Sequence, residues 1–366
     1  MPADTPSPAP QRLVSLDALR GFDMFWILGF GGVVEAVAKH FCPGTALEKL
    51  IDTQLEHVNW QGFHVEDLIF PLFLFIAGVS MALALPKRLQ REGMGVTVRH
   101  LVARALIIFV IGIIYSGGLS KGFDQIRWLG VLQRIGLASA IAGMLSLVLH
   151  ARSLIITAVS LLVGYYLMLK FIPVPGFGAG DFAEGHNLTN YLDRIWLPGR
   201  KYDGDHDPEG ILSTLPAIAS ALLGILAGKG LNSSATTGKK VLGLIICGSA
   251  LVVLGWLWDP YFPVVKKLWS SSFVLVAGGW SAILLGVFYG IIDGLNWKGW
   301  APPCVWVGAN PIALYLASGL GFFSVVSGRL VGYPPSEWSW ITSLATFLVM
   351  LMTARWLYKR GIYIRI

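Results

Sequence analysis

The sequence is dominated by long stretches of predominantly apolar residues. An α-helix needs about 20 such residues to cross the hydrocarbon core of a bilayer. Ten stretches reach or approach this length: 13–37, 64–85, 101–119, 128–149, 153–172, 211–228, 240–258, 270–292, 304–326 and 339–358. The chain is therefore predicted to be an all-α polytopic membrane protein with about ten transmembrane helices.

The composition of the 366 residues excludes other classes of protein. Hydrophobic residues make up 55% of the chain, charged residues 13%, and the mean hydropathy is +0.65. Soluble domains carry about 25% charged residues, and a soluble globule of this size could not hide so much apolar surface. A net charge of +7 would suggest a nucleic-acid partner for a soluble domain, but here the cations are expected to mark cytoplasmic loops and no nucleic acid is expected.

Charge is distributed unevenly between the two sets of loops. Ten spans place both termini on one side, and that side collects most of the Lys and Arg residues, while the other side is rich in Asp and Glu. Cytoplasmic loops carry the excess of Lys and Arg. Both termini are therefore predicted to be cytoplasmic, with external loops at 38–63 and 173–210. Residues 1–11 are predicted to be a disordered cytoplasmic tail that precedes a single transmembrane domain, 12–366.

Polar residues at membrane depth are costly and are usually functional. Arg20 and Asp23 stand at the start of the first span, at a spacing that permits an ion pair. The alternative is an arginine that reaches toward the interface beside a helix-capping acid.

A second polar cluster, 57–67, leads from the first external loop into the second span. His57 precedes a predicted break at Gly62, so it can fold back over the end of the following helix. Histidine titrates near neutrality and is the commonest general base, and a carboxylate such as Asp67 can orient an imidazole. His64 and Asp67 can also share a helix face. The alternative is a wet interfacial loop whose histidines have no chemical role.

A third cluster, 203–210, stands just before the sixth span and contains four acids and one histidine. Its alternating oxygen ligands resemble a metal site, but the spacing does not match an EF-hand loop and Pro208 interrupts it. We therefore expect no metal. A hydrogen-bonding rim for a polyhydroxy ligand and a cap for the next helix remain as alternatives.

Single polar residues also occur within the spans, namely Gln133, Arg134, Trp269, Ser271 and Asn310. An intramembrane arginine needs a partner or a water-filled cavity, whereas Ser and Asn can simply hydrogen-bond between helices. The signatures of soluble enzymes, including the P-loop, G-x-S-x-G, H-E-x-x-H and C-x-x-C, are absent from the sequence.

Several of these motifs together resemble the heparan-α-glucosaminide N-acetyltransferase family. The matching segments follow one another along the chain: Leu16–Trp26, His57-x-x-Trp60-x-Gly62 with 67–71, 132–136, 207–210, 267–273, and the stretch around Gly308, Asn310 and Tyr315. The resemblance is specific because the segments occur in order from residue 12 to about 320. It is to bacterial inner-membrane members, and it therefore implies a multi-pass protein of the inner (cytoplasmic) membrane.

The resemblance implies a transmembrane transfer of an acetyl group. Acetyl-CoA, the co-substrate, would bind on the cytosolic side, and the acceptor would be the amino group of a glucosamine-type sugar on the periplasmic side. The family's active-site histidine corresponds to His57, which would remove the amine proton while Asp67 orients its ring. A covalent acetyl-histidine is the alternative mechanism. The lysosomal animal enzymes of the family carry an Asn in the segment that matches 29–32, where this sequence has Gly29, so any acetyl or oxyanion contact of that Asn would need another donor.

Further residues are expected to hold the two substrates. The acetyl-CoA candidates are Arg20, Lys87, Arg88, Arg104, Lys239 and Lys240 for the phosphates, with Gln133 and Arg134 along the pantetheine arm. The candidates for the acceptor sugar are Asn59, Trp60, Asp207, Glu209, Trp269, Ser271 and Asn310. The competing hypotheses are an amino-sugar permease without chemistry and an O-acyltransferase that acts on a cell-envelope glycan. Besides the two substrates, the expected partners are membrane lipid and a second copy of the chain, in a homodimer.

Overall fold

The computed structural model describes residues 13–118, 120, 122–332, 335 and 338–364, so the predicted tail 1–11 lies outside it. Within these residues the chain is helical, and no β-strand occurs beyond isolated two-residue bridges. The elements are α1 (Val14–Ile27), α2 (Phe30–Phe41), α3 (Ala46–Leu55), α4 (Val65–Tyr115), η1 (Phe123–Gln125), α5 (Val131–Val148), α6 (Ala151–Phe171), α7 (Leu188–Trp196), α8 (Thr214–Leu231), α9 (Thr237–Trp258), α10 (Ser271–Phe288), η2 (Tyr289–Gly294), α11 (Pro302–Gly308), α12 (Pro311–Gly319), α13 (Phe322–Val331) and α14 (Ser339–Lys359).

Seven helices of the described chain are long and apolar enough to cross a membrane. They are α4, α5, α6, α8, α9, α10 with η2, and α14. Two bent pairs, α1 with α2 and α12 with α13, pass the same test together, which gives nine if each pair crosses once. The expected class, an all-helical polytopic membrane protein, is confirmed for the described residues, and the number of ten helices stays a prediction.

The longest helix, α4, covers two of the predicted spans. It has 51 residues, and a straight helix of that length would measure about 77 Å, against a bilayer core of about 30 Å. Its backbone leaves helical geometry at Gly93, where φ is 79°. Met81 and Leu101, from opposite sides of this break, both lie against Gly143 of α5. The helix therefore folds back at Gly93, and its halves correspond to the predicted spans 64–85 and 101–119.

Two predicted spans, 13–37 and 304–326, are interrupted where the sequence suggested continuous helices. The first breaks at Gly29, whose φ of 102° lies in the left-handed region, and α1 and α2 meet there at an angle of 56°. The second is divided into α11, α12 and α13. Pro311 has no N–H with which to continue α11, and Gly321 has a φ of 74° between α12 and α13.

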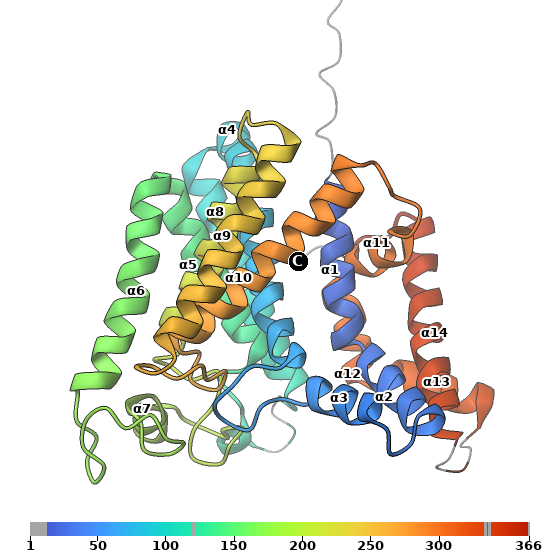
Figure 1. Ribbon diagram of the computed structural model, residues 1–366, viewed down its shortest axis with the longest axis horizontal. Helices are drawn as coiled ribbons and strands as arrows, with labels where there is room; N and C mark the ends of the chain where they lie inside the picture. Colours follow the sequence, from blue (N-terminus) through green and yellow to red (C-terminus); the bar gives the residue numbers. More distant parts are fainter. Residues whose placement is uncertain (1–12, 119, 121, 333–334, 336–337, 365–366) are drawn as a thin grey trace, which may run out of the picture.

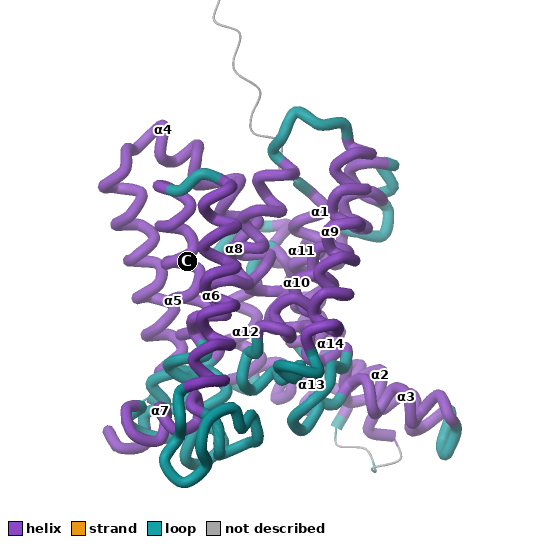
Figure 2. Tube along the Cα trace, turned by 60° about the vertical axis from the view of Figure 1, so that its left-hand side comes forward, coloured by secondary structure: helices purple, strands orange, loops and turns teal. Residues whose placement is uncertain are grey.

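The helices form two groups, with α4 to α10 on one side and α1, α2 and α11 to α14 on the other (Figure 1). The largest group of loops lies at one end of the molecule, beside α7 (Figure 2). The predicted external loops 38–63 and 173–210 meet at that end, where the Trp60 indole Nε1 donates a hydrogen bond to the Phe182 carbonyl at 3.1 Å. The bend of α4 and the start of α9 lie at the opposite end (Figure 1).

Glycines allow α4 and α8 to pack with their backbones in close contact. A Cβ on Gly78 of α4 would lie 2.2 Å from the Ala221 carbonyl oxygen, and a Cβ on Gly224 of α8 would lie 2.0 Å from that of Phe75. Small residues at helix crossings are the usual device for such approach in membranes. This contact fixes the distance between α4 and α8. Asp67, at the start of α4, is thereby held in position relative to the other helices of the same group.

We expect Gly224→Ala to lower the thermal stability of the protein in detergent. The added methyl group has no space against the α4 backbone, and overpacking of this kind costs about 1–3 kcal/mol. Gly230→Ala is the matched control, because it lies on the same helix and a Cβ there would contact nothing within 4 Å. Equal melting temperatures for the two variants would contradict the proposed close contact.

Candidate functional site

The site is built around the Asp67 carboxylate at the start of α4. Asp67 lies in the first turn of the helix and is completely buried. Its Oδ2 accepts a hydrogen bond from the His64 backbone N–H at 3.0 Å, which caps the helix, and lies 3.4 Å from the Val58 N–H. Its Oδ1 lies 3.1 Å from His57 Nδ1. The same side chain thus fixes the helix start and holds the imidazole.

His57 reaches Asp67 because the chain between them turns back over the helix end. The imidazole side chain is 56% exposed. His64, the other histidine of the cluster, does not join this group: its Nδ1 lies 2.8 Å from the Glu56 carbonyl oxygen. The structure therefore pairs the Asp67 side chain with His57. His64 and Asp67 interact only through the backbone N–H of His64, which caps the helix, and not through the two side chains.

Lys266, which the sequence analysis did not single out, completes the group. It comes from the loop between α9 and α10, and its Nζ lies 3.0 Å from His57 Nδ1, 3.2 Å from His57 Nε2 and 3.4 Å from Asp67 Oδ1. Burial lowers the pKa of the Lys266 ammonium, and the Asp67 carboxylate partly offsets this effect. The only sequence signal for Lys266 is its place directly before the motif 267–273.

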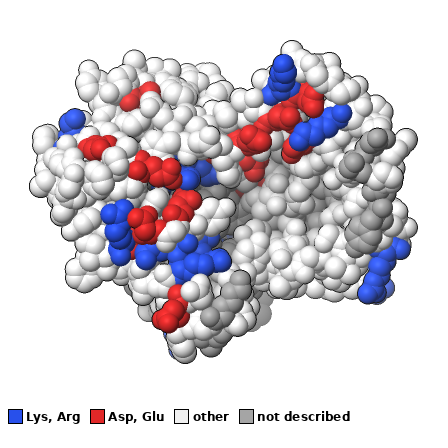
Figure 3. All heavy atoms as spheres, turned by 90° about the horizontal axis from the view of Figure 1, so that it is seen from below, with Lys and Arg blue, Asp and Glu red and all other residues white. Residues whose placement is uncertain are grey.

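These charged groups stand at the mouth of a cavity of about 400 Å³ between the two groups of helices. Its charged residues and histidine are His57, Glu66, Arg127, Glu209, Lys266 and Lys267, two tyrosines, Tyr202 and Tyr315, also line it, and its apolar lining comes from α1, α4, α5, α12 and Trp269. Figure 3 views the molecule from this end and shows charged side chains gathered beside a hollow in the surface. A mostly apolar cavity with a few convergent polar groups is the usual form of a small-molecule site.

A second charged group joins the predicted residues Asp207 and Glu209 to Arg127, which the sequence analysis did not single out, and two of its members, Arg127 and Glu209, line the cavity. Arg127, from the loop before α5, donates to Asp207 at 2.8 and 2.7 Å and to Glu209 at 2.6 Å. Burial opposes the charge of Arg127, but the two carboxylates outweigh it and raise the pKa of the guanidinium. Asp207 is completely buried, so of the two predicted sugar contacts in this segment only Glu209 lines the cavity.

The other residues predicted for the sugar are placed differently from one another. Trp269 forms part of the cavity wall, and its Nε1 donates to the Ser220 hydroxyl. Asn59 is exposed on the loop. The Ser271 hydroxyl donates to the Leu162 carbonyl, and the Asn310 amide bonds the backbone of Ile362 and Ile364. The side chains of Ser271 and Asn310 are thus engaged within the protein, because each is buried and needs a partner.

The residues predicted for acetyl-CoA fall into separate regions. Gln133 and Arg134 lie at the loop end of α5, where the buried Arg134 donates to the Ser213 hydroxyl and the Gln133 amide donates to the Arg127 carbonyl. Arg20 donates to Ser80 and pairs with Asp17 at 3.2 Å, which corrects the predicted pairing with Asp23.

The remaining candidates are Lys87, Arg88 and Arg104 on α4 and Lys239 and Lys240 on α9. Lys239 and Lys240 line a different, mainly apolar groove of about 660 Å³ between α6, α8, α9 and α10.

Comparison with known proteins assigns the chain to a family. A profile described as heparan-alpha-glucosaminide N-acetyltransferase, catalytic, matches residues 12–255, which include His57, Asp67, Arg127 and Glu209. The chain belongs to the heparan-alpha-glucosaminide N-acetyltransferase family. It is 30% identical over 377 aligned positions to the human heparan-alpha-glucosaminide N-acetyltransferase, covering 85% of this chain and 53% of the human protein. The mouse protein of the same name is 27% identical, covering 85% of this chain and 56% of its own length.

The family assignment confirms the resemblance indicated by the motifs. The chain spans about half the length of the curated relatives that it matches. Lys266 and Trp269 lie outside the segment matched by the family profile, which ends at residue 255. The cavity of this family member is therefore completed by a part of the chain that the profile does not cover.

The Asp193 carboxylate of α7, which hydrogen-bonds the backbone of the segment that carries Glu209, is expected to make the stability of the protein depend on pH. It is completely buried and accepts hydrogen bonds from the backbone N–H of Ile211 at 2.9 Å and of Asp207 at 3.4 Å. Burial raises the pKa of Asp193 to about 6. The native state therefore binds more protons here than the unfolded state between pH of about 4 and 6, so this group's contribution to stability falls as pH rises through that range and is constant above it.

We expect Asp193→Asn, whose side chain does not titrate, to change the pH profile of the melting temperature. The variant should be less stable than the wild type near pH 4.5, because the amide replaces one of two acceptor oxygens. The difference should shrink near pH 7.5, where the wild type carries a buried charge. A difference in melting temperature that stays constant between the two pH values would rule out this titration.

Proposed function

We propose that the chain is an N-acetyltransferase that moves the acetyl group of acetyl-CoA to the amino group of a glucosamine-type sugar. The observation that carries this proposal is the grouping of His57, Asp67 and Lys266 at the mouth of a cavity with an apolar interior. Membership of the family supports acetyl transfer as the reaction. The names of the human and mouse relatives favour a glucosaminide as the acceptor.

In this reaction His57 acts as the general base. The sugar ammonium first loses one proton to water. As the neutral amine nitrogen then bonds to the thioester carbonyl carbon, the imidazole takes its next proton, and the buried Asp67 carboxylate steadies the resulting imidazolium. The C–S bond then breaks, and the imidazolium returns its proton to the CoA thiolate. His57 has the exposure needed for direct contact with a sugar, since more than half of its side chain is accessible.

Lys266 is proposed to stabilise the oxyanion that forms on the thioester carbonyl. Gly29 stands where relatives are expected to carry an Asn donor, and a glycine side chain offers none. The Lys266 ammonium lies within 3.2 Å of both ring nitrogens of His57 and is mostly buried, with 19% of its side chain exposed. A donor fixed in a partly water-excluded site stabilises developing negative charge more strongly than water does.

The two substrates are proposed to approach from opposite ends of the molecule. Glu66 and Glu209 line the cavity at the loop end and favour a cationic amino sugar. Lys87, Arg88, Lys239 and Lys240 belong to the end that carries the bend of α4 and the start of α9 (Figure 1), and they offer cations for the CoA phosphates. In this arrangement the loops 38–63 and 173–210 are periplasmic, the termini are cytoplasmic, and the membrane is the bacterial inner membrane.

We expect His57→Ala to reduce acetyl transfer about 10²–10⁴-fold, the usual effect of removing a general base, while the protein stays folded. Lys266→Met should reduce turnover about 10²–10³-fold, as loss of an oxyanion donor does. The measurement is release of free thiol from acetyl-CoA with glucosamine as acceptor. Stabilisation by CoA in a thermal-shift assay should persist in both variants, because the phosphate contacts are remote from His57.

His64→Ala is the matched control for His57→Ala. His64 belongs to the same loop. Among the described residues its ring has one hydrogen-bond partner, the Glu56 carbonyl, and the helix cap uses its backbone N–H. This variant should keep most of the activity. Normal turnover in His57→Ala would refute the general base, and glucosamine uptake without thiol release would favour a permease instead. Thiol release with hydroxylated acceptors that lack an amine would favour O-acyl transfer.

The proposed sidedness can be tested with single cysteines in a background that lacks Cys42, Cys247 and Cys304. In intact cells an impermeant thiol reagent should label Asp124→Cys, which is exposed at the loop end, and should not label Ser234→Cys, which is exposed before α9. The physical basis is the excess of Lys and Arg in cytoplasmic loops. Reversed labelling would place the CoA-binding cations on the wrong side of the membrane for a cytosolic donor.

A further inference from the structure

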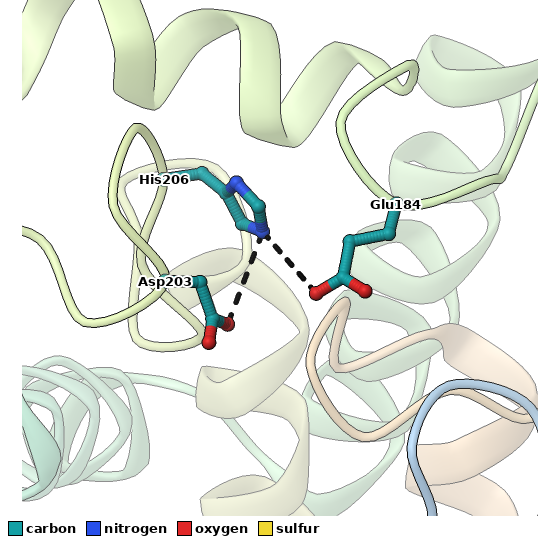
Figure 4. A group of neighbouring side chains, drawn as sticks. All are labelled: Glu184, Asp203 and His206. Atoms are coloured by element: carbon teal, nitrogen blue, oxygen red, sulfur yellow. Dashed lines mark ion pairs between the residues drawn. The ribbon is translucent and has the colours of Figure 1, made fainter.

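A group of potential metal ligands lies beside the cavity, outside the groups used for acetyl transfer. Glu184 precedes α7, Asp203 and His206 belong to the loop that follows it, and the ligand atoms of all three lie within 4.8 Å of one another. His206 Nε2 is 3.6 Å from Glu184 Oε1 and 3.8 Å from Asp203 Oδ2 (Figure 4). Glu184 is separated from the acidic segment 203–210 in the sequence, so the spacing of that segment could not indicate this group.

The His206 ring is oriented for metal binding. Its side chain is only 6% exposed, and its Nδ1 lies 2.7 Å from Asp205 Oδ1, so the Asp205 carboxylate accepts the ring proton. Nε2, the other ring nitrogen, is buried and has no hydrogen-bond partner among the described residues. It points at two carboxylate oxygens (Figure 4). A ring nitrogen that faces two carboxylate oxygens at 3.6 and 3.8 Å leaves room for a cation between them, and a carboxylate behind the imidazole is the usual outer-shell partner of a metal-bound histidine.

The distances fit a small transition-metal ion. Zinc binds histidine nitrogen and carboxylate oxygen at about 2.0–2.2 Å, which places tetrahedral ligand atoms about 3.3–3.6 Å apart. The separations from His206 Nε2, 3.6 and 3.8 Å, need a slight contraction to reach this range, and the two carboxylates, which lie within 4.8 Å of each other on either side of Lys267 Nζ, need to close further. We propose that His206, Glu184 and Asp203 bind a zinc ion, with Asp205 as the outer-shell partner of His206. Three protein ligands leave the fourth position to water.

Lys267 competes with the metal for this site. Its Nζ lies 2.8 Å from Glu184 Oε1 and 3.1 Å from Asp203 Oδ2, so its ammonium supplies the cation when no metal is bound. Both cations cannot hold the same oxygens. Zinc therefore displaces Lys267, which already lines the cavity and neighbours Lys266. The metal would thus add positive charge to the wall of the cavity and change its affinity for a cationic acceptor.

The test is zinc binding by the full chain, purified in detergent without a polyhistidine tag and stripped with a chelator. We expect isothermal titration to give one zinc ion per chain, and a matching rise in melting temperature. His206→Ala should abolish this binding, and Asp205→Asn should weaken it about 10–100-fold, as loss of an outer-shell partner does. Lys267→Met should strengthen it, because the competing ammonium is gone.

His186→Ala is the matched control, since His186 lies on the same loop, pairs with Asp181 at 2.9 Å and stacks on Phe177. It should bind zinc as the wild type does. Equal zinc affinity in His206→Ala, or no binding by the wild type, would overturn the site. Binding by Lys267→Met alone would show that the native group is an ion-pair cluster filled by lysine, which also refutes the proposal. None of these outcomes depends on acetyl transfer.

Discussion

A backbone N–H or C=O that leaves a helix inside a bilayer finds no water, so it must be buried in protein or must line a cavity. This constraint bears on the irregular segments that interrupt the predicted spans. The breaks after Ile27 and before Pro311 both adjoin residues of the cavity lining, namely Ile27, Pro311 and Ile312. At the second break the buried Asn310 amide bonds the backbone of 362 and 364. The break before Pro311 meets this requirement inside the protein, whereas Gly29 and Leu320, at the other two breaks, are exposed on the surface of the chain.

Carboxylates at the loop end are buried together with their partners, and they connect the fold to the chemistry. One oxygen of Asp67 caps α4 while the other faces His57 and Lys266, so the position of the imidazole depends on where the helix begins. Arg127 likewise holds Asp207 and Glu209, and Arg127 and Glu209 line the same cavity. A buried charge that loses its partner is strongly destabilising. The loops of this end are therefore held in place by the charges that line the site.

Much of the fold followed from composition, because apolar stretches of about 20 residues have few alternatives to a transmembrane helix. The exceptions are instructive. The stretch 304–326 is apolar throughout, and its hydropathy does not reveal that Asn310, Pro311 and Gly321 divide it into three short helices. For the site, the motif 57–67 suggested His57 and Asp67, and the structure brings them to 3.1 Å. Lys266, Arg127 and Glu184 had no such signal, since a lysine, arginine or glutamate in a polar loop is ordinarily solvated.

The sequence by itself determined the helical membrane architecture, the family and the histidine of greatest interest. These features are local or periodic: hydropathy along a segment, charge within a loop, and motifs of a few residues. Only the tertiary structure decided which distant residues share a site. Lys266 reaches His57 across 209 positions of the chain, and Arg127 reaches Asp207 across 80. Such pairs arise from the packing of α4, α8 and α10 and from the folding of the long loops over the helix ends, and neither leaves a pattern in the spacing of the residues.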